Sequence, residues 1–310
     1  MQRRCYSCDE IITATNKAVE HIIPNALGGK LKNPFLLCAS CNSRLGGEVD
    51  EPFFDQMGFV VNRLGIKRER GDPPPIKARL FETGDPVHLS SDRTTFAPRT
   101  RITKSGPGYV VECDQKNLGK AQETLKRKFP NVRISKIEPI EYDAQFRFET
   151  DFGGEACYRA ITKMALNYYL HLGGSSSYVK EAISFIKTGG NNVFVLLYYP
   201  TWDVLPRRAQ GQLFHVIAIR GDPSQKLLYG YVELFSAFRC LVTLSDAYDG
   251  DYVSDSYCFD LRDRQEVQTE IRLYQSRSTI ADVAASGVHL DGFKKRVQDL
   301  FVGDLTINIS

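Results

Sequence analysis

The sequence lacks any apolar run close to the roughly 18 residues that a membrane-spanning helix requires, so no contact with a membrane interior is expected. Its first residues, Met1 to Cys5, are basic and lack the apolar core of a secretory signal. Internal repeats and low-complexity tracts are also absent. The charged fraction of 25% is ordinary for a folded protein, so long disordered segments are not indicated. These absences favour a folded protein of the cytoplasm.

Chain length and apolar content indicate more than one domain. The 310 residues are enough for two ordinary domains, and the apolar fraction of 42% can fill their cores. In a reducing cytoplasm, the eight cysteines are expected to be metal ligands or buried thiols, and not a disulfide framework.

Charge is spread unevenly along the chain, although the net charge is only +3. Residues 1–135 carry 22 Lys and Arg against 15 Asp and Glu, a balance of +7. Residues 136–310 carry 18 against 22, a balance of −4. A basic front half suits a polyanionic partner such as nucleic acid. An ordinary fluctuation in composition gives the same pattern, so charge alone does not decide.

Three regions are predicted along the chain. Residues 1–62 hold paired cysteines and end in a helix. The apolar residues at helical spacing there are Val49, Phe53, Met57 and Val60. Residues 63–107 form a basic, proline-rich connector, because three consecutive prolines at 73–75 cannot continue a helix. Residues 108–310 form a larger α+β domain that would select a target, sense a signal or mediate oligomerisation.

Hydrophobic periodicity predicts the elements of this larger domain. Strands are expected at 108–113, 132–137, 145–149, 193–199, 213–219, 227–235, 239–245 and 256–260, and helices at 117–129, 155–172, 178–187 and 291–301. Short polar turns between the later strands indicate an antiparallel meander. Ser177 is the expected N-cap of the third of these helices, and His215, in mid-strand, is expected to be a buried core histidine.

Two Cys-x-x-Cys pairs give the strongest signal. Cys5 and Cys8 form the first pair and Cys38 and Cys41 the second, with 29 residues between them. Each tight turn can place two thiolates at corners of a tetrahedron, so the two pairs predict a structural zinc site. A domain this small has little core, and zinc would supply much of its folding free energy, which reaches roughly 10–16 kcal/mol in zinc-finger peptides.

A second motif lies between the cysteine pairs. It reads Glu20-His21-Ile22-Ile23-Pro24-Asn25-Ala26-Leu27-Gly28-Gly29, followed by Asn33 and, directly after Cys41, by Asn42. Residues 19–23 are expected to form a strand, 24–29 a loop whose glycines can adopt positive φ, and 35–37 a second strand. A helix is expected to begin at or just after Asn42. The sequence therefore predicts a β-hairpin followed by a helix, built around a four-cysteine zinc site.

The order and spacing of these elements resemble the HNH endonuclease family. The matching elements are Cys-x-x-Cys, Glu-His-Ile-Ile-Pro, Leu-Gly-Gly, an asparagine five positions before a cysteine, and Cys-x-x-Cys-Asn. The resemblance covers about residues 5–55 and is closest to the zinc-knuckle branch found in bacterial restriction and phage-defence nucleases. It implies an N-terminal ββα-metal (treble-clef-like) zinc module. Together with the elements predicted for residues 108–310, this gives an α+β protein in which the module is followed by a larger α+β domain with a mainly antiparallel sheet.

The resemblance also implies roles for individual residues. His21 would be the general base that takes a proton from the attacking water, a task that an imidazole with a pKa near 6.5 suits at neutral pH. Glu20 and Asn42 would hold a catalytic divalent ion, and Asn33 would brace the loop that positions His21. The ion would stabilise charge on the scissile phosphate and the departing 3′ oxygen, leaving a 5′-phosphate.

One departure from the family pattern bears on the choice of metal. Asn42 stands at the third signature position, where the family's name expects histidine, although asparagine is a frequent variant. Carboxylate and amide oxygens are hard ligands, so Mg²⁺ or Mn²⁺ is favoured as the catalytic ion, beside the structural Zn²⁺. Two protein ligands bind such an ion weakly, and substrate phosphate and water would complete its coordination.

Basic side chains in and after this motif are candidates for contacts with a phosphate backbone. They are Lys30, Arg44, Arg63, Lys67, Arg68 and Arg70. For the run at 63–70, a solvated linker face explains the same charges equally well.

The sequence therefore predicts a metal-dependent HNH endonuclease that hydrolyses phosphodiester bonds of DNA, in restriction or phage defence. Double-stranded DNA is the preferred substrate, and RNA is an alternative that the sequence does not exclude. Assembly into a homo-oligomer is compatible with the sequence. The alternative is a non-catalytic zinc module that binds nucleic acid or another protein. Such a module would tolerate the loss of His21.

Overall fold

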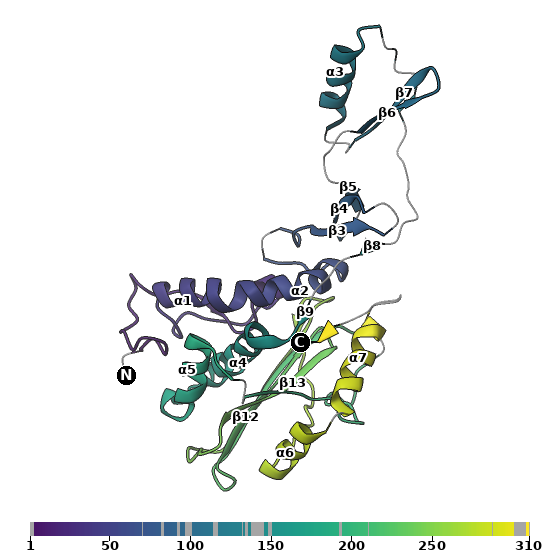
Figure 1. Ribbon diagram of the computed structural model, residues 1–310. Helices are drawn as coiled ribbons and strands as arrows, with labels where there is room; N and C mark the ends of the chain where they lie inside the picture. The colour runs from purple at the N-terminus through teal and green to yellow at the C-terminus, as the bar shows by residue number, and fades with distance from the viewer. Residues whose placement is uncertain are drawn as a thin grey trace. The chain divides into compact units, whose positions relative to one another are not determined.

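A computed structural model gives a fold of mixed helices and antiparallel sheet (Figure 1). It describes residues 3–69, 71–81, 84–91, 94–96, 101–113, 117–131, 133, 136–137, 146–147, 151–191, 194–209, 211–286, 288–300 and 308–309. The chain forms two compact units. Unit 1 comprises residues 1–57, 67–71 and 150–310, and unit 2 comprises residues 58–66 and 72–149. The sequence-based division at residues 62 and 107 stays a proposal.

The N-terminal elements are short and carry the paired cysteines. They are β1 Glu20–His21, the 3-10 helix η1 Asn25–Leu27, β2 Lys32–Asn33, α1 Ala39–Leu45, the π-helix η2 Gly46–Asp50 and α2 Glu51–Arg63. β1 and β2 pair in antiparallel fashion, which confirms the predicted hairpin. The helix predicted from apolar spacing is also confirmed, because all four of the apolar residues that predicted it are buried.

Two predicted boundaries in this segment are wrong. The second strand lies at Lys32–Asn33 and not at residues 35–37. The chain turns directly after this strand, because Asn33 Oδ1 accepts a hydrogen bond from Phe35 N at 2.8 Å. The helix expected at or just after Asn42 begins at Ala39. The second cysteine pair is therefore part of the helix start, and Asn42 lies within the first turn of α1.

Unit 2 contains a four-stranded antiparallel sheet, a separate hairpin and a helix. The sheet has the order β5-β4-β3-β8, with β3 Ile76–Leu80, β4 Pro86–Leu89, β5 Thr94–Phe96 and β8 Phe146–Arg147. The hairpin joins β6 Arg101–Ser105 to β7 Gly108–Glu112, and the helix is α3 Leu118–Lys128. The strand predicted at 108–113 and the helix predicted at 117–129 are confirmed. Most of the strand residues predicted at 132–137 and 145–149 lie outside the described residues.

A six-stranded antiparallel sheet forms the centre of unit 1. Its order is β10-β13-β12-β11-β14-β15, with β10 Val195–Leu197, β11 Phe214–Asp222, β12 Leu227–Leu234, β13 Phe238–Ser245, β14 Val253–Asp260 and β15 Gln265–Glu266. The predicted meander is confirmed for β11 to β13, whereas β14 returns to pair with β11. A short parallel pair joins β9 Asp151–Phe152 to β16 Asn308–Ile309.

Beyond residue 150, unit 1 contains the three predicted helices and one, α6, that sequence analysis missed. The helical elements are α4 Gly154–His171, the 3-10 helix η4 Ser176–Val179, α5 Lys180–Thr188, α6 Arg277–Ala285 and α7 Val288–Leu300. The predicted cap Ser177 is wrong, because α5 begins at Lys180 with Val179 at its N-cap. Ser177 lies within η4, where its N donates a hydrogen bond to the side chain of Ser175, the N-cap of that 3-10 helix. Among the described helices, none is long and apolar enough to cross a membrane.

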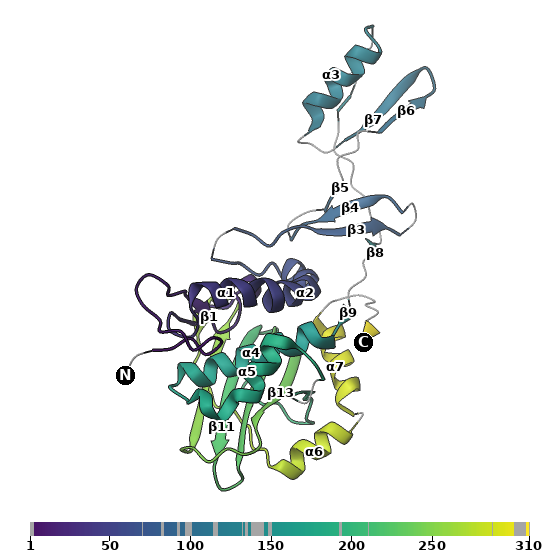
Figure 2. The same cartoon turned by 60° about the vertical axis from the view of Figure 1, so that its left-hand side comes forward.

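Both faces of the six-stranded sheet are covered. Val216, Ala218 and Tyr231 belong to a buried cluster against which residues of α6 pack. On another part of the sheet, a Cβ on Gly230 would meet the Cβ of Ala165 in α4 at 3.0 Å, so glycine permits this helix to approach closely. Figures 1 and 2 show α4 between α1 and the sheet. Because it has neighbours on two sides, α4 is buried over most of its circumference.

Candidate active site

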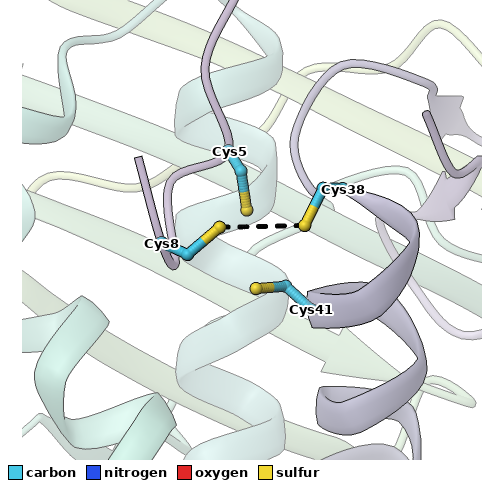
Figure 3. A group of neighbouring side chains, drawn as sticks. All are labelled: Cys5, Cys8, Cys38 and Cys41. Carbon is cyan, nitrogen blue, oxygen red and sulfur yellow. Dashed lines mark hydrogen bonds between the residues drawn. The ribbon is translucent and has the colours of Figure 1, made fainter. Parts of the chain in front are cut away.

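Four cysteine side chains converge near the N-terminus (Figure 3). Cys5 and Cys8 flank a tight turn, whereas Cys38 caps α1 and Cys41 lies in its first turn. All four Sγ atoms lie within 4.8 Å of one another, and those of Cys8 and Cys38 are 3.7 Å apart. A tetrahedral ion with Zn–S bonds of about 2.3 Å needs sulfur separations of about 3.8 Å. The cluster therefore has the donors and the spacing to bind zinc.

The β1–β2 ladder brings the central residues of the motif together. Glu20 lies opposite Asn33. In the connecting loop, Gly28 has a φ of 93°, and a Cβ on Gly29 would lie only 1.9 Å from the carbonyl oxygen of Ile23. Glycine alone fits these two positions, so the Leu-Gly-Gly sequence determines how the two strands meet.

His21 has the environment of a neutral base. Its side chain is 20% exposed, and its buried Nε2 has no hydrogen-bond partner among the described residues. Glu69 Oε2 lies 3.7 Å from that nitrogen, beyond hydrogen-bond range, and Glu69 Oε1 lies 2.6 Å from Lys32 Nζ. Burial lowers the pKa of His21, an effect that Glu69 opposes and Lys32 reinforces. A lowered pKa keeps the imidazole neutral near pH 7, in the form that accepts a proton.

Glu20 lies in a buried cluster of charged and polar side chains. Its Oε1 is 2.7 Å from Lys163 Nζ and accepts a hydrogen bond from Asn167 Nδ2 at 2.9 Å. The same Lys163 Nζ donates to Asp50 Oδ2 at 2.6 Å. Burial raises the pKa of Glu20, and Lys163 opposes that rise. Burial alone would lower the pKa of Lys163, but the two carboxylates raise it above its ordinary value, so the ammonium stays charged.

Asn42 offers the second oxygen expected at a catalytic metal. Its Oδ1 is buried and has no hydrogen-bond partner among the described residues. A buried amide oxygen without a donor is suited to a cation. The donor set of Glu20 and Asn42 thus fits Mg²⁺ or Mn²⁺ in chemical kind, although one oxygen of Glu20 is engaged by Lys163.

Asn33 links the motif to the far end of α4. Its Oδ1 closes the turn after β2, and its Nδ2 lies 3.2 Å from Nδ1 of His171, the last residue of α4. Both ends of this amide are therefore engaged, which fixes its orientation. The arrangement holds the turn rigid on the side of β2 that faces α4.

The candidate phosphate contacts occupy varied environments. Arg44 is exposed and donates to Glu48 Oε2 and Ser7 Oγ, and Arg63 and Lys67 are exposed. The remaining three are Lys30, which is partly buried, Arg68, whose guanidinium lies 4.8 Å from the ring centre of Phe54, and Arg70, which lies outside the described residues. Their contact with nucleic acid stays a prediction.

Several residues around the motif were missed by sequence analysis. They are Asp50, Glu69, Lys163, Asn167 and His171. A signal existed for the last three, because they recur at intervals of four along a helix that is apolar over most of its other positions. Such spacing places polar side chains on one face, which indicates a polar neighbour for that face.

Comparison with known proteins agrees with this geometry. Residues 5–57 match the family model of the HNH endonucleases, a span that includes both cysteine pairs, Glu20, His21, Asn33 and Asn42. No curated protein and no solved structure gives a significant match to the chain. The match supports a nuclease-type function and a nucleic-acid substrate. By this match, residues 5–57 are an HNH endonuclease domain, and their cysteine cluster is consistent with the zinc-knuckle branch of that family.

Proposed function

We propose that the chain is a metal-dependent endonuclease that hydrolyses phosphodiester bonds of DNA, with His21 as its general base. The state of His21 carries the proposal. Its Nε2 has no hydrogen-bond partner among the described residues, and burial lowers its pKa. A neutral imidazole, on the residue that directly follows Glu20 in β1, is suited to accept a proton from an attacking water.

Each residue of the motif has a separate task in this reaction. His21 accepts the proton of the water as it attacks the scissile phosphate. Asn33 holds the turn after β2 through Phe35 N and His171. Glu20 and Asn42 would hold Mg²⁺ or Mn²⁺, which supplies charge stabilisation at the phosphate and the departing 3′ oxygen when bound. The four-cysteine zinc would have a purely structural role.

Double-stranded DNA is the proposed substrate, with RNA as the alternative. The exposed side chains of Arg44 and Lys67, in the same unit as the motif, support a polyanionic ligand. A role in restriction or phage defence is proposed from the family resemblance alone, and a cytoplasmic location stays a proposal. Target selection or oligomerisation by residues 108–310 is proposed because small nuclease modules bind chiefly the backbone and supply little specificity.

Cleavage of plasmid DNA tests this function directly. The purified, zinc-loaded chain is incubated with Mg²⁺ or Mn²⁺, with and without EDTA. His21→Ala should slow cleavage by about 10²–10⁴-fold, because a general base contributes that much. His88→Ala, on β4 in unit 2, is the matched control and should cut at the wild-type rate. Undiminished cleavage by His21→Ala would remove His21 from its proposed role.

One observation favours the non-catalytic alternative. The ion pair between Glu20 and Lys163 satisfies the carboxylate without any metal. A zinc module that only binds nucleic acid or protein would need no more than this. Binding of DNA without cleavage under every metal condition, and equal binding by His21→Ala, would support that alternative.

A further inference from the structure

One face of α4 contacts the HNH motif along much of its length. Lys163, Asn167 and His171 are spaced four residues apart and therefore project from the same side of the helix. Through them α4 reaches Glu20, Asp50 and Asn33. Another side of α4 lies against the sheet at Gly230. Helix α4 therefore belongs both to the candidate active site and to the core around the six-stranded sheet.

The ammonium of Lys163 occupies a position suited to a bound cation. The side chain is 2% exposed, and two carboxylates from separate elements lie within 2.7 Å of its Nζ. One ammonium between two carboxylates leaves a net negative charge. Tyr6 Oη and Asn167 Oδ1 are also buried, with no hydrogen-bond partner among the described residues.

We propose that Lys163 is an internal competitor of the catalytic divalent ion, so that its ammonium and the metal bind the Glu20 carboxylate in alternation. This inference rests on the proposed function, because it takes Glu20 as a ligand of that ion. A dication on Glu20 Oε1 would lie within a few ångströms of the ammonium, and like charges at such range in a buried site repel strongly. The catalytic ion can therefore bind Glu20 in the wild-type protein only when Lys163 moves away. Until then, Lys163 of α4 keeps the nuclease in a metal-free resting state.

Removing the charge of Lys163 should convert the cluster into a better metal site. Two buried carboxylates without their ammonium are left uncompensated, and a divalent ion can replace the lost charge. Mn²⁺ binding to the zinc-loaded full-length chain, measured by calorimetry or electron paramagnetic resonance, is the readout. Lys163→Met should bind Mn²⁺ at least about ten-fold more tightly than wild type. Lys163→Arg keeps the charge and should bind no more tightly than wild type.

Folding of each variant is judged by zinc content and thermal unfolding. If Lys163→Met does not fold, Lys163→Gln carries the test, because its amide can still donate to one carboxylate. Lys180→Met, an exposed lysine at the start of α5, is the matched control and should leave Mn²⁺ affinity unchanged. Adding Glu20→Gln to Lys163→Met should abolish the tighter binding, because it removes the ligand that both cations share.

The outcomes separate this inference from the proposed function. Equal Mn²⁺ affinity in wild type and Lys163→Met overturns the competition and leaves metal-dependent cleavage standing. Tighter binding by Lys163→Met, with no cleavage of nucleic acid by any variant, supports the competition and overturns the proposed function. Absence of Mn²⁺ binding in every variant overturns the competition, and the plasmid cleavage assay then decides the proposed function.

Discussion

The zinc cluster depends on each of its four thiolates. Removing one ligand from a tetrahedral site leaves an open corner and sharply weakens binding. Cys8→Ala is therefore expected to lower the zinc content from about one ion per chain toward none, and to lower the thermal stability of the N-terminal segment. Cys258→Ala removes a buried thiol of β14 and should keep its zinc. X-ray fluorescence measures the zinc content of both variants. A Cys8→Ala protein that still holds one zinc ion per chain would contradict the assignment of Cys8 as a zinc ligand.

His215 should make stability fall in mild acid. It is fully buried, its ring Nε2 lies 2.9 Å from Leu27 O, and burial lowers its pKa to about 4. In the unfolded chain its pKa is about 6.5, so between these values only the unfolded state binds the proton. The free energy of unfolding should thus decrease as pH falls from about 6.5 to about 4, by about 3 kcal/mol in total.

The measurement is urea unfolding at several pH values, for wild type and for His215→Gln. Glutamine can keep a donor near Leu27 O but does not titrate, so its stability should vary less over this range. Zinc release in acid affects both proteins, and the difference between their slopes isolates the histidine. Identical slopes would mean that His215 does not remain neutral in the folded state.

The loop between β1 and β2 requires glycine at position 29 for a steric reason. Gly29→Ala would place a Cβ 1.9 Å from Ile23 O, so the backbone must shift. We expect a loss of roughly 1–3 kcal/mol in the free energy of unfolding, as for other overpacked sites. Gly47→Ala, in η2 with open space around the added Cβ, should be neutral or stabilising by about 0.5–1 kcal/mol. Denaturant unfolding compares the two, and equal effects would contradict this steric account.

The order of elements could be predicted because it depends on local periodicity. Helix α4 and strands β11 to β13 follow from apolar residues at helical or alternating spacing. Two of the errors lie where a side chain bonds to the nearby backbone. Asn33 turns the chain before the expected second strand, and Ser175 caps the 3-10 helix η4, which includes the expected cap Ser177. Several serines near that cap could serve, and spacing alone does not choose among them.

The candidate site could be predicted only where its residues are close in sequence. The cysteine pairs, His21 and Asn42 lie within one short segment, and their spacing is informative. Asn167, in contrast, is 147 residues from its partner Glu20. Such a contact depends on how α4 packs between the hairpin and the sheet, which no local pattern specifies. The polar stripe on α4 indicates that this face has a polar neighbour, but not which one.

Unit 1 combines the N-terminal segment with residues 150–310, so each of these two segments should depend on the other for stability. Residues 1–71 contain the zinc cluster, but the side chains that bond to Glu20, Asn33 Nδ2 and Leu27 O all come from beyond residue 150. Expressed alone, residues 1–71 should bind zinc yet unfold at a lower temperature than in the full chain. Without α4, the apolar side chains beneath the hairpin lose part of their cover.

Residues 150–310, supplied as a separate chain, should restore that stability by association, detected as a stable complex in size-exclusion chromatography. The ion pairs of Lys163 provide the control. Lys163→Glu would place a third carboxylate beside Glu20 and Asp50 and should prevent association, because like charges buried together cannot all remain ionised. If residues 1–71 alone are as stable as they are in the full chain, the hairpin does not need α4. The contacts of Lys163 would then serve the chemistry of Glu20 and not the fold.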